Sequence, residues 1–356
     1  MRPVERHYVT EFKDYSPSEH RVDGKKIGFG VDLDGCVDMG MEKHLLAFGV
    51  ASIIHYGFQP IQSLAMKAWM YANYYSLDRG VSRFIALYRW ADILRGTRAA
   101  QGLGLPVPEL RYLRRWCDVT SAYSPEALSA FIDGGDFAGV LEDGDSKSEA
   151  VEELADVLVW SAKVNALVGD ATANMTAFPN AVKMIQDGYQ RGVDYAIVSG
   201  TPQAHIEAHV EKYGIAGCLE GLWGQQAGRK SQGLVTMMVG PVERDEIQSA
   251  IDDGKPLLDS REAVYDALVM IGDAHKDNEE REKANLALSG RKDGPIRMHL
   301  VPVESENDSW AVLHGNLDKI IAGTWSADEE ARMIADGLAN LSVEWDESPV
   351  YNFRRA

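Results

Sequence analysis

Apolar positions along this chain recur with two different periods, and the change between them divides the sequence. The stretch KKIGFGVDLD places small and branched apolar residues before two aspartates, a pattern typical of a strand buried in a parallel sheet. From about residue 42 to about residue 175, apolar residues instead follow helical spacing, as in IQSLAMKAWMYANYYSL and SKSEAVEELADVLVWSAKVNAL. No strand pattern interrupts this region, so we expect it to be all helical.

After residue 175, helix and strand patterns alternate. FPNAVKMIQDGYQRG predicts a helix with Pro179 near its start, VDYAIVSG predicts a buried strand, and TPQAHIEAHVEKYG predicts a helix that ends at Gly214. Further strands are predicted at LEGLWGQ, ALVMIGD and IRMHLVPV. The alternation predicts an α/β fold, a Rossmann-like parallel sheet with an all-helical domain inserted after its first strand.

These patterns also predict where the domains begin and end. A chain of 356 residues is long for a single core. We expect a core made of residues 1–40 and 176–303, and a helical insert at 41–175. Residues 304–356 are acidic and mostly helical in pattern, with Trp310, Trp325 and Trp345 spread through them. We expect this C-terminal extension to pack on the core.

Charge narrows the classes of partner. The chain carries 36 Lys and Arg against 54 Asp and Glu, a net charge of -18. Such a field repels nucleic acid and anionic membranes, so neither is an expected partner. An anionic substrate would need a locally positive site or a bound cation. The sequence indicates no oligomeric state.

Cysteine usage and the N-terminal segment bear on location. The three cysteines, Cys36, Cys117 and Cys218, are widely spaced and follow no metal-ligand pattern. A disulfide framework is therefore not expected. The N-terminal segment has no apolar run of the kind found in secretory signals. We expect a cytoplasmic protein.

Polar residues follow three of the predicted strands at the point where each strand ends. In an open parallel sheet, these ends meet at one edge, where ligands bind. Carboxylates gathered there suit Mg²⁺, whereas a hydroxyl with free backbone N–H groups suits phosphate oxygens. GRKSQG adds Lys230, a cation that could neutralise phosphate charge. The residues at the three strand ends are Asp32 and Asp34, then Ser199, Gly200 and Thr201, and then Asp273 and Asp277.

Four short motifs carry a resemblance to a known family. DLDG, IVSG, GRKS and GDAHKD, in this order and on these elements, resemble the four motifs of the haloacid dehalogenase superfamily. The resemblance extends from about residue 26 to about residue 300 and is strongest to phosphatases with a large helical cap. The helical insert occupies the position of a C1 cap in that family. A single DxDG would be a weak signal, but four ordered motifs are a strong one.

The resemblance implies a role for each motif residue. Asp32 would be the nucleophile that forms an aspartyl-phosphate, and Asp34 would protonate the leaving oxygen and later activate water. Ser199 and the Gly200 N–H would bind phosphate oxygens, and Lys230 would pair with both Asp32 and the phosphate. The implied Mg²⁺ ligands are Asp32, Asp34 through its backbone carbonyl, Asp273 and Asp277.

Some positions depart from the family pattern. Cys36 stands where threonine or an aliphatic residue is commoner, and we expect it to be a packed residue. His275 and Lys276 stand where the fourth motif often has proline and glycine; a solvent-facing histidine is the favoured interpretation there. The separation of Lys230 from Asp273 is long, which leaves Lys255 as the alternative cation, although GQQAGRKS favours Lys230.

Substrate contacts are expected in the helical insert. Arg79 and Arg83 are four residues apart and share a helical face if the helix is continuous there. They could bind an anionic or sugar-like substrate, or could simply be exposed arginines on a helix whose aromatic residues pack in the core. Lys163 and Asn165 are weaker candidates of the same kind.

The predicted function is a Mg²⁺-dependent phosphomonoester hydrolase acting on a small phosphorylated metabolite. Asp34 argues against a dehalogenase or a phosphonatase, because neither needs that second acid. Two alternatives stay open, a phosphomutase or phosphotransferase of the same superfamily and a non-catalytic phosphometabolite-binding protein.

Overall fold

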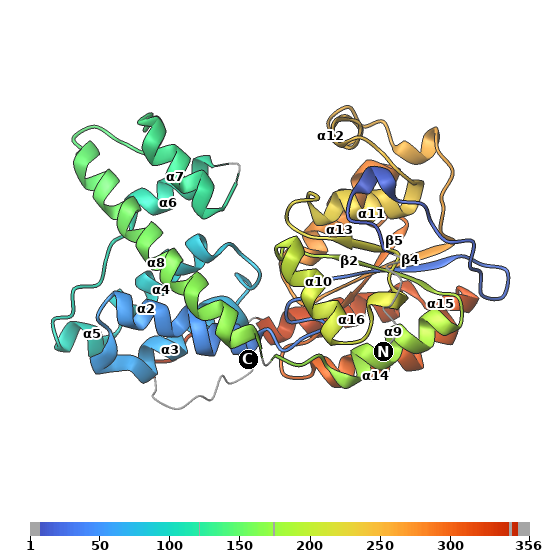
Figure 1. Ribbon diagram of the computed structural model, residues 1–356, viewed down its shortest axis with the longest axis horizontal. Coiled ribbons are helices and arrows are strands. Elements are labelled where there is room, and N and C mark those ends of the chain that lie inside the picture. The colour runs from blue at the N-terminus through green and yellow to red at the C-terminus, as the bar shows by residue number, and fades with distance from the viewer. Residues whose placement is uncertain (1–7, 121, 174, 342–343, 348–356) are drawn as a thin grey trace. The chain divides into compact units, whose positions relative to one another are not determined.

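The computed structural model describes residues 8–120, 122–173, 175–341 and 344–347 of the chain. Contacts between residues divide the chain into two compact units. The core unit comprises Met1–Gly40 and Thr176–Asn340, and the helical unit comprises Met41–Met175 and Leu341–Ala356. Figure 1 draws the helices and strands of both units. No helix among the described residues is both long enough and apolar enough to span a membrane.

The core unit is built on a five-stranded parallel sheet with the strand order β3-β2-β1-β4-β5. β1 is central, and Phe29 on it is in register with Tyr195 of β2 on one side and Val269 of β4 on the other. The strand order reverses direction at β1, and in open parallel sheets ligands bind beyond the carboxyl ends of the strands at such a point. The predicted α/β fold is confirmed, and all five predicted strands are present. They are β1 (Ile27–Val31), β2 (Asp194–Val198), β3 (Gly221–Trp223), β4 (Ala267–Gly272) and β5 (Ile296–Leu300).

Helices cover both faces of this sheet (Figure 1). One apolar cluster joins α9 (Pro179–Gln190), α10 (Gln203–Lys212), α14 (Glu306–Gly315) and α15 (Leu317–Ala322) to one face. A second cluster joins α11 (Lys230–Val239), α12 (Arg244–Asp252) and α13 (His275–Ser289) to the other face, with α16 (Ala327–Leu341) against it. Apolar residues on both faces explain why the strand sequences show continuous apolar runs.

The helical unit contains no strand in residues 41–120, 122–173 and 175, as predicted. Its interior holds fully buried tryptophans whose indole N–H groups find acceptors: Trp90 donates to the Ala65 carbonyl at 2.8 Å and Trp160 to the Ser52 hydroxyl at 3.0 Å. Trp90 is thus a core residue. The helices are α1 (Met41–Lys43), α2 (Gly49–His55), α3 (Gln62–Met70), α4 (Arg83–Arg95), α5 (Arg98–Gly102), α6 (Arg111–Val119), α7 (Pro125–Gly134) and α8 (Lys147–Ala173), with π-helical turns at His44–Phe48 and Tyr71–Tyr75.

The C-terminal extension differs from the expectation that all of it packs on the core. Trp310 and Trp325 are buried in the core unit. Trp345 instead packs against Tyr71 of the helical unit, with ring centroids 5.4 Å apart, and Lys67 donates to the Asp346 carbonyl at 2.5 Å. The extension is therefore shared between the units, because the last described tryptophan finds its apolar partner on the helical insert. Residues 348–356 lie outside the described residues.

Candidate active site

The end of β1 places the first two aspartates of the site. The Asp32 N–H continues the ladder by donating to the Ile271 carbonyl of β4 at 2.9 Å. The buried Asp32 carboxylate accepts from the Leu33 N–H at 2.8 Å. Two residues later, Asp34 Oδ2 accepts from the Thr201 hydroxyl at 2.5 Å. The sheet thus fixes the position of Asp32, and a residue beyond β2 holds Asp34.

The end of β2 provides a hydroxyl and exposed backbone beside these carboxylates. The buried Ser199 donates its N–H to the Trp223 carbonyl at 3.0 Å, and its Oγ accepts from the Thr201 N–H at 3.3 Å. Gly200 is exposed, and a Cβ atom built on it would have no neighbour within 4 Å. There is accordingly room for a ligand oxygen to approach the backbone at Gly200.

The end of β4 contributes two more buried carboxylates, Asp273 and Asp277. Asp277 Oδ2 accepts from the backbone N–H groups of Asp273 at 3.1 Å and Ala274 at 3.0 Å, so it caps the start of α13. Gly272 allows this turn, because a Cβ atom there would lie 2.5 Å from the Asp277 side chain. The local sequence therefore requires a glycine just before Asp273.

Lys230, the first residue of α11, is the cation of the site. Its Nζ lies 2.6 Å from Asp32 Oδ2 and also donates to Asp277 Oδ1. Lys255, the alternative, has an 82% exposed side chain and pairs with Asp253 at 3.5 Å. The structure thus brings Lys230, and not Lys255, to the predicted nucleophile.

Burial and charge act in opposite directions at this pair. Burial raises the pKa of Asp32 to about 6, and the neighbouring Lys230 ammonium acts to lower it. Burial acts to lower the pKa of Lys230, but the carboxylates of Asp277 and Asp32 outweigh that effect and hold its pKa above the usual value. Lys230 is therefore a permanent cation between two carboxylates.

The carboxylates form a group that fits a divalent metal ion. Asp32, Asp273 and Asp277 are all buried, and each offers an oxygen within 4.8 Å of those of the others. Three buried carboxylates exceed the charge that one lysine can neutralise, and hard oxygen ligands are those that Mg²⁺ prefers. The Asp34 carboxylate is not part of this group, so the role of its backbone carbonyl as a ligand stays a prediction.

The two arginines proposed for substrate contact do not share a helix. Gly80, with φ +80°, interrupts the chain before α4 begins at Arg83. Arg79 is buried, 3% exposed, with its guanidinium 4.0 Å from the centre of the Tyr74 ring. The helix is not continuous between the two positions, so they share no helical face, because a left-handed glycine turn separates them.

Arg83 has a different environment. Its guanidinium donates to Asn165 Oδ1 at 2.6 Å and lies 5.2 Å from the centre of the Phe48 ring. Burial lowers the pKa of Arg83, and the charge of Glu126 acts against this. Among the described residues, no carboxylate lies within 4 Å of it. The structure thus brings Arg83 and Asn165 together, and the partner of this arginine is a neutral amide.

The positions that depart from the family pattern have structural explanations. Cys36 is fully buried, and burial raises the pKa of its thiol well above the usual value, so it is a packed residue. The His275 side chain is 41% exposed and lies 3.6 Å from Glu279, and Lys276 pairs with the same glutamate at 2.8 Å. The solvent-facing interpretation of His275 agrees with this exposure.

Two residues in the site had no role assigned to them from the sequence. Thr201 was noted only as part of the SGT motif, yet its hydroxyl bonds the predicted acid/base. Glu280 is buried on α13 and accepts from the Ser231 N–H at 3.3 Å and the Ser231 hydroxyl at 2.8 Å, which fixes the start of α11 next to Lys230. A helix written HKDNEEREK gives no sequence signal that this glutamate, among several, is buried.

Replacing each of the two lysines with alanine tests which of them is the cation of the third motif. Lys230→Ala should reduce turnover by several orders of magnitude, because it leaves Asp32 and Asp277 without their shared counter-charge. Lys255→Ala, a matched change at an exposed lysine, should leave turnover unchanged. Steady-state kinetics of both variants, with thermal unfolding as a check on folding, give the answer. An inactive Lys255→Ala protein beside an active Lys230→Ala protein would reverse the assignment.

No family model and no curated protein matches this chain. Solved structures similar to it include a haloacid dehalogenase-like hydrolase from Streptococcus pneumoniae, at 12% identity and a TM-score of 0.32, covering 80% of this chain and 90% of that one. Others are a predicted phosphoglycolate phosphatase from Haemophilus somnus (12%, TM-score 0.34, 77% and 83% covered) and L-2-haloacid dehalogenase from Xanthobacter autotrophicus (11%, 0.31, 83% and 86%).

What supports the family resemblance is internal to the molecule. All four motifs lie at the carboxyl edge of one parallel sheet, with Lys230 between Asp32 and Asp277. These four motifs and the contacts of Lys230 carry the resemblance of the chain to the haloacid dehalogenase superfamily.

Proposed function

We propose that this protein is a Mg²⁺-dependent phosphomonoester hydrolase that acts on a small phosphorylated metabolite through an aspartyl-phosphate. The observation that supports this best is the contact of Lys230 with both Asp32 and Asp277. A carboxylate can attack a phosphate dianion only where their repulsion is offset. The positive charge of Lys230, in contact with Asp32, offsets part of that repulsion.

The first half of the reaction transfers the phosphoryl group to the enzyme. An oxygen of Asp32 forms a bond to phosphorus as the bond from phosphorus to the ester oxygen breaks. Asp34 gives its proton to the departing oxygen, so the product leaves as an alcohol. Ser199 and the Gly200 N–H hold the non-bridging oxygens, and Lys230 neutralises charge on both Asp32 and the phosphoryl group.

The second half returns the enzyme to its starting state. Asp34, now a carboxylate, takes a proton from water while the water oxygen forms a bond to phosphorus. The bond from phosphorus to Asp32 breaks, inorganic phosphate leaves, and Asp34 is again protonated. The hydrogen bond from Thr201 to Asp34 keeps this side chain beside the reacting phosphorus in both steps.

Asp32, Asp273 and Asp277 would hold the Mg²⁺ ion. When bound, it supplies positive charge that stabilises the phosphoryl oxygens. Two backbone N–H groups hold one oxygen of Asp277, which would orient this side chain toward the ion.

A screen of the purified protein against phosphorylated metabolites tests this function. Release of inorganic phosphate with Mg²⁺, its loss in excess chelator and its return on adding Mg²⁺ are the expected results. Full activity in excess chelator would contradict the metal requirement. An isomerised sugar phosphate without phosphate release would identify a phosphomutase, and binding without turnover would identify a phosphometabolite-binding protein.

We also propose that Arg83 contacts an anionic part of the substrate, because it is a half-buried cation with no carboxylate partner among the described residues. Arg83→Gln should raise KM for the natural substrate and leave hydrolysis of a small aryl phosphate nearly unchanged. The matched control is Arg89→Gln on the same helix, where the arginine is exposed and pairs with Asp78 at 3.4 Å. Equal losses on both substrates would assign Arg83 a structural role.

A further inference from the structure

A fully buried carboxylate lies four residues beyond the predicted acid/base. Asp38 is 0% exposed. Its Oδ1 accepts from the Gly35 N–H at 3.3 Å, and its Oδ2 accepts from the Tyr213 hydroxyl at 3.2 Å and lies 3.2 Å from His209 Nδ1. We refer to Asp38, His209 and Tyr213 as the Asp38 network. None of the three belongs to the motifs that carry the proposed reaction.

The first bond of the Asp38 network reaches the residue next to Asp34. Gly35 follows Asp34 directly with φ +72°, and the turn closes as the N–H groups of Val37 and Asp38 donate to the Leu33 carbonyl at 2.9 and 3.2 Å. Gly40 packs against this turn, where a Cβ atom would lie 2.7 Å from the Gly35 nitrogen. Asp38 therefore stabilises, from within, the turn that carries Asp34.

The other bonds of the Asp38 network lead to the second strand end of the site. His209 lies on α10, which begins at Gln203, two residues after Thr201, and Tyr213 caps the end of that helix. The Thr201 hydroxyl already bonds the Asp34 carboxylate. Asp34 is thus held from two sides, through its side chain by Thr201 and through its turn by Asp38, and both supports lead to the same segment.

Stability alone is a weak reason for this arrangement. Burying a carboxylate is costly, and a buried ion pair often contributes little net stability even when it is well bonded. The contacts of Asp38 with Gly35, His209 and Tyr213 are long, at 3.2 to 3.3 Å, compared with the 2.7 to 2.9 Å typical of charge-assisted hydrogen bonds. Such a group is better suited to fixing one geometry of a turn than to stabilising the fold.

We infer that Asp38 is a positioning residue, which holds Asp34 where it can protonate the leaving oxygen. The inference rests on the proposed function, because it assigns Asp38 to the acid/base of that reaction. A displacement of about 1 Å in a reacting group can reduce a rate by about a hundredfold. The loss should depend on how much the leaving group needs a proton.

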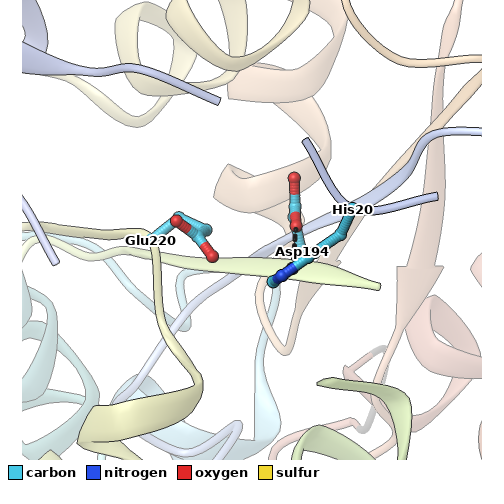
Figure 2. Close-up of side chains that lie close together, drawn as sticks. All are labelled: His20, Asp194 and Glu220. Carbon is cyan, nitrogen blue, oxygen red and sulfur yellow. Dashed lines mark ion pairs between the residues drawn. The ribbon is translucent and has the colours of Figure 1, made fainter. Parts of the chain in front are cut away.

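The core unit contains a matched control for this residue. Asp194, the first residue of β2, is also 0% exposed, accepts from the Tyr265 hydroxyl at 2.8 Å and the Ser18 hydroxyl at 2.6 Å, and lies 3.8 Å from His20. Figure 2 shows Asp194 with His20 and Glu220. These bonds explain Asp194 without a metal ion. It lies at the amino edge of the sheet, away from the predicted catalytic residues.

The experiment compares Asp38→Asn, Tyr213→Phe and Asp194→Asn. Single-turnover release of the leaving group is measured with an alkyl phosphate found in the screen and with p-nitrophenyl phosphate, whose leaving group needs little protonation. We expect Asp38→Asn to slow the alkyl ester at least about tenfold more than the aryl ester, within the range that proton transfer contributes. Tyr213→Phe, a milder change that keeps the carboxylate, should show a smaller difference in the same direction. Asp194→Asn should affect both esters equally or not at all.

Hydrogen exchange of the segment from Asp32 to Gly40 gives a second readout that needs no activity. It should become faster in Asp38→Asn and stay unchanged in Asp194→Asn. The inference would be overturned if Asp38→Asn and Tyr213→Phe slowed the alkyl and the aryl ester equally. It would also be overturned if Asp194→Asn slowed the alkyl ester more than the aryl ester. Either result would leave the proposed function intact. If the wild-type protein hydrolyses no phosphate ester, the proposed function fails. In that case, an unchanged rate of hydrogen exchange in Asp38→Asn would still show, independently of activity, that Asp38 does not order the turn.

Discussion

Asp32→Asn is expected to abolish turnover of every phosphate ester and to leave no phosphorylated protein. The amide oxygen can still accept from the Leu33 N–H, so the side chain should keep its place. What is lost is the carboxylate that forms the bond to phosphorus, and loss of a nucleophile typically costs several orders of magnitude in kcat. Acid-quenched reactions analysed by mass spectrometry would show a phosphoryl mass shift on wild-type protein alone.

The folded state of this variant should survive the change. Burial already disfavours the charged form of Asp32, as its raised pKa indicates. A neutral amide therefore reduces repulsion among the buried carboxylates, while Lys230 keeps Asp277 as a partner. Thermal unfolding is the control. A phosphoryl label on the Asp32→Asn protein, or on a wild-type peptide that lacks residue 32, would refute the assignment of the nucleophile.

Asp34→Asn should fail at a different step. The amide can still accept from the Thr201 hydroxyl, but it can neither give nor take a proton. Turnover of alkyl phosphates should fall about a hundred- to ten-thousand-fold, the range that proton transfer by a side chain contributes. An aryl phosphate, whose leaving group needs little protonation, should still phosphorylate Asp32 slowly.

The phosphoenzyme of this variant should then persist, because no base remains to activate water. Trapping the label on a peptide that contains residue 32 would support both roles together. The matched comparison is Asp194→Asn, the same chemical change at a buried aspartate at the opposite edge of the sheet, which should accumulate no phosphoenzyme. Normal turnover by Asp34→Asn would show that another group moves the proton.

Strand and helix patterns predicted most of the core. The apolar runs before Asp32, Ser199 and Asp273 identify strands buried on both faces, because only such strands avoid polar positions on either side. Since parallel strands end at one edge, the order of the motifs was enough to predict that these residues converge. The structure confirms the sheet and brings Asp32, Asp273 and Asp277 together at that edge, where Lys230 contacts the first and the last of them.

Long-range side-chain contacts were not predictable in the same way. Lys230 and Lys255 are both plausible cations in the sequence, and only the packing of α11 against α13 directs one of them to Asp32. Arg79 and Arg83 looked equivalent until the turn at Gly80 separated them.

The hydrophobic period was sufficient to predict the fold class, and the local motifs were sufficient to propose a chemistry at the strand ends, because both are properties of neighbouring residues. Tertiary structure decided what depends on residues far apart in the chain. Asp38 meets His209 and Tyr213 across 171 and 175 positions, and Trp345 lies against Tyr71 of the insert. Nothing in the local pattern marks these side chains, since a buried polar group is recognised only by the partners that folding brings to it.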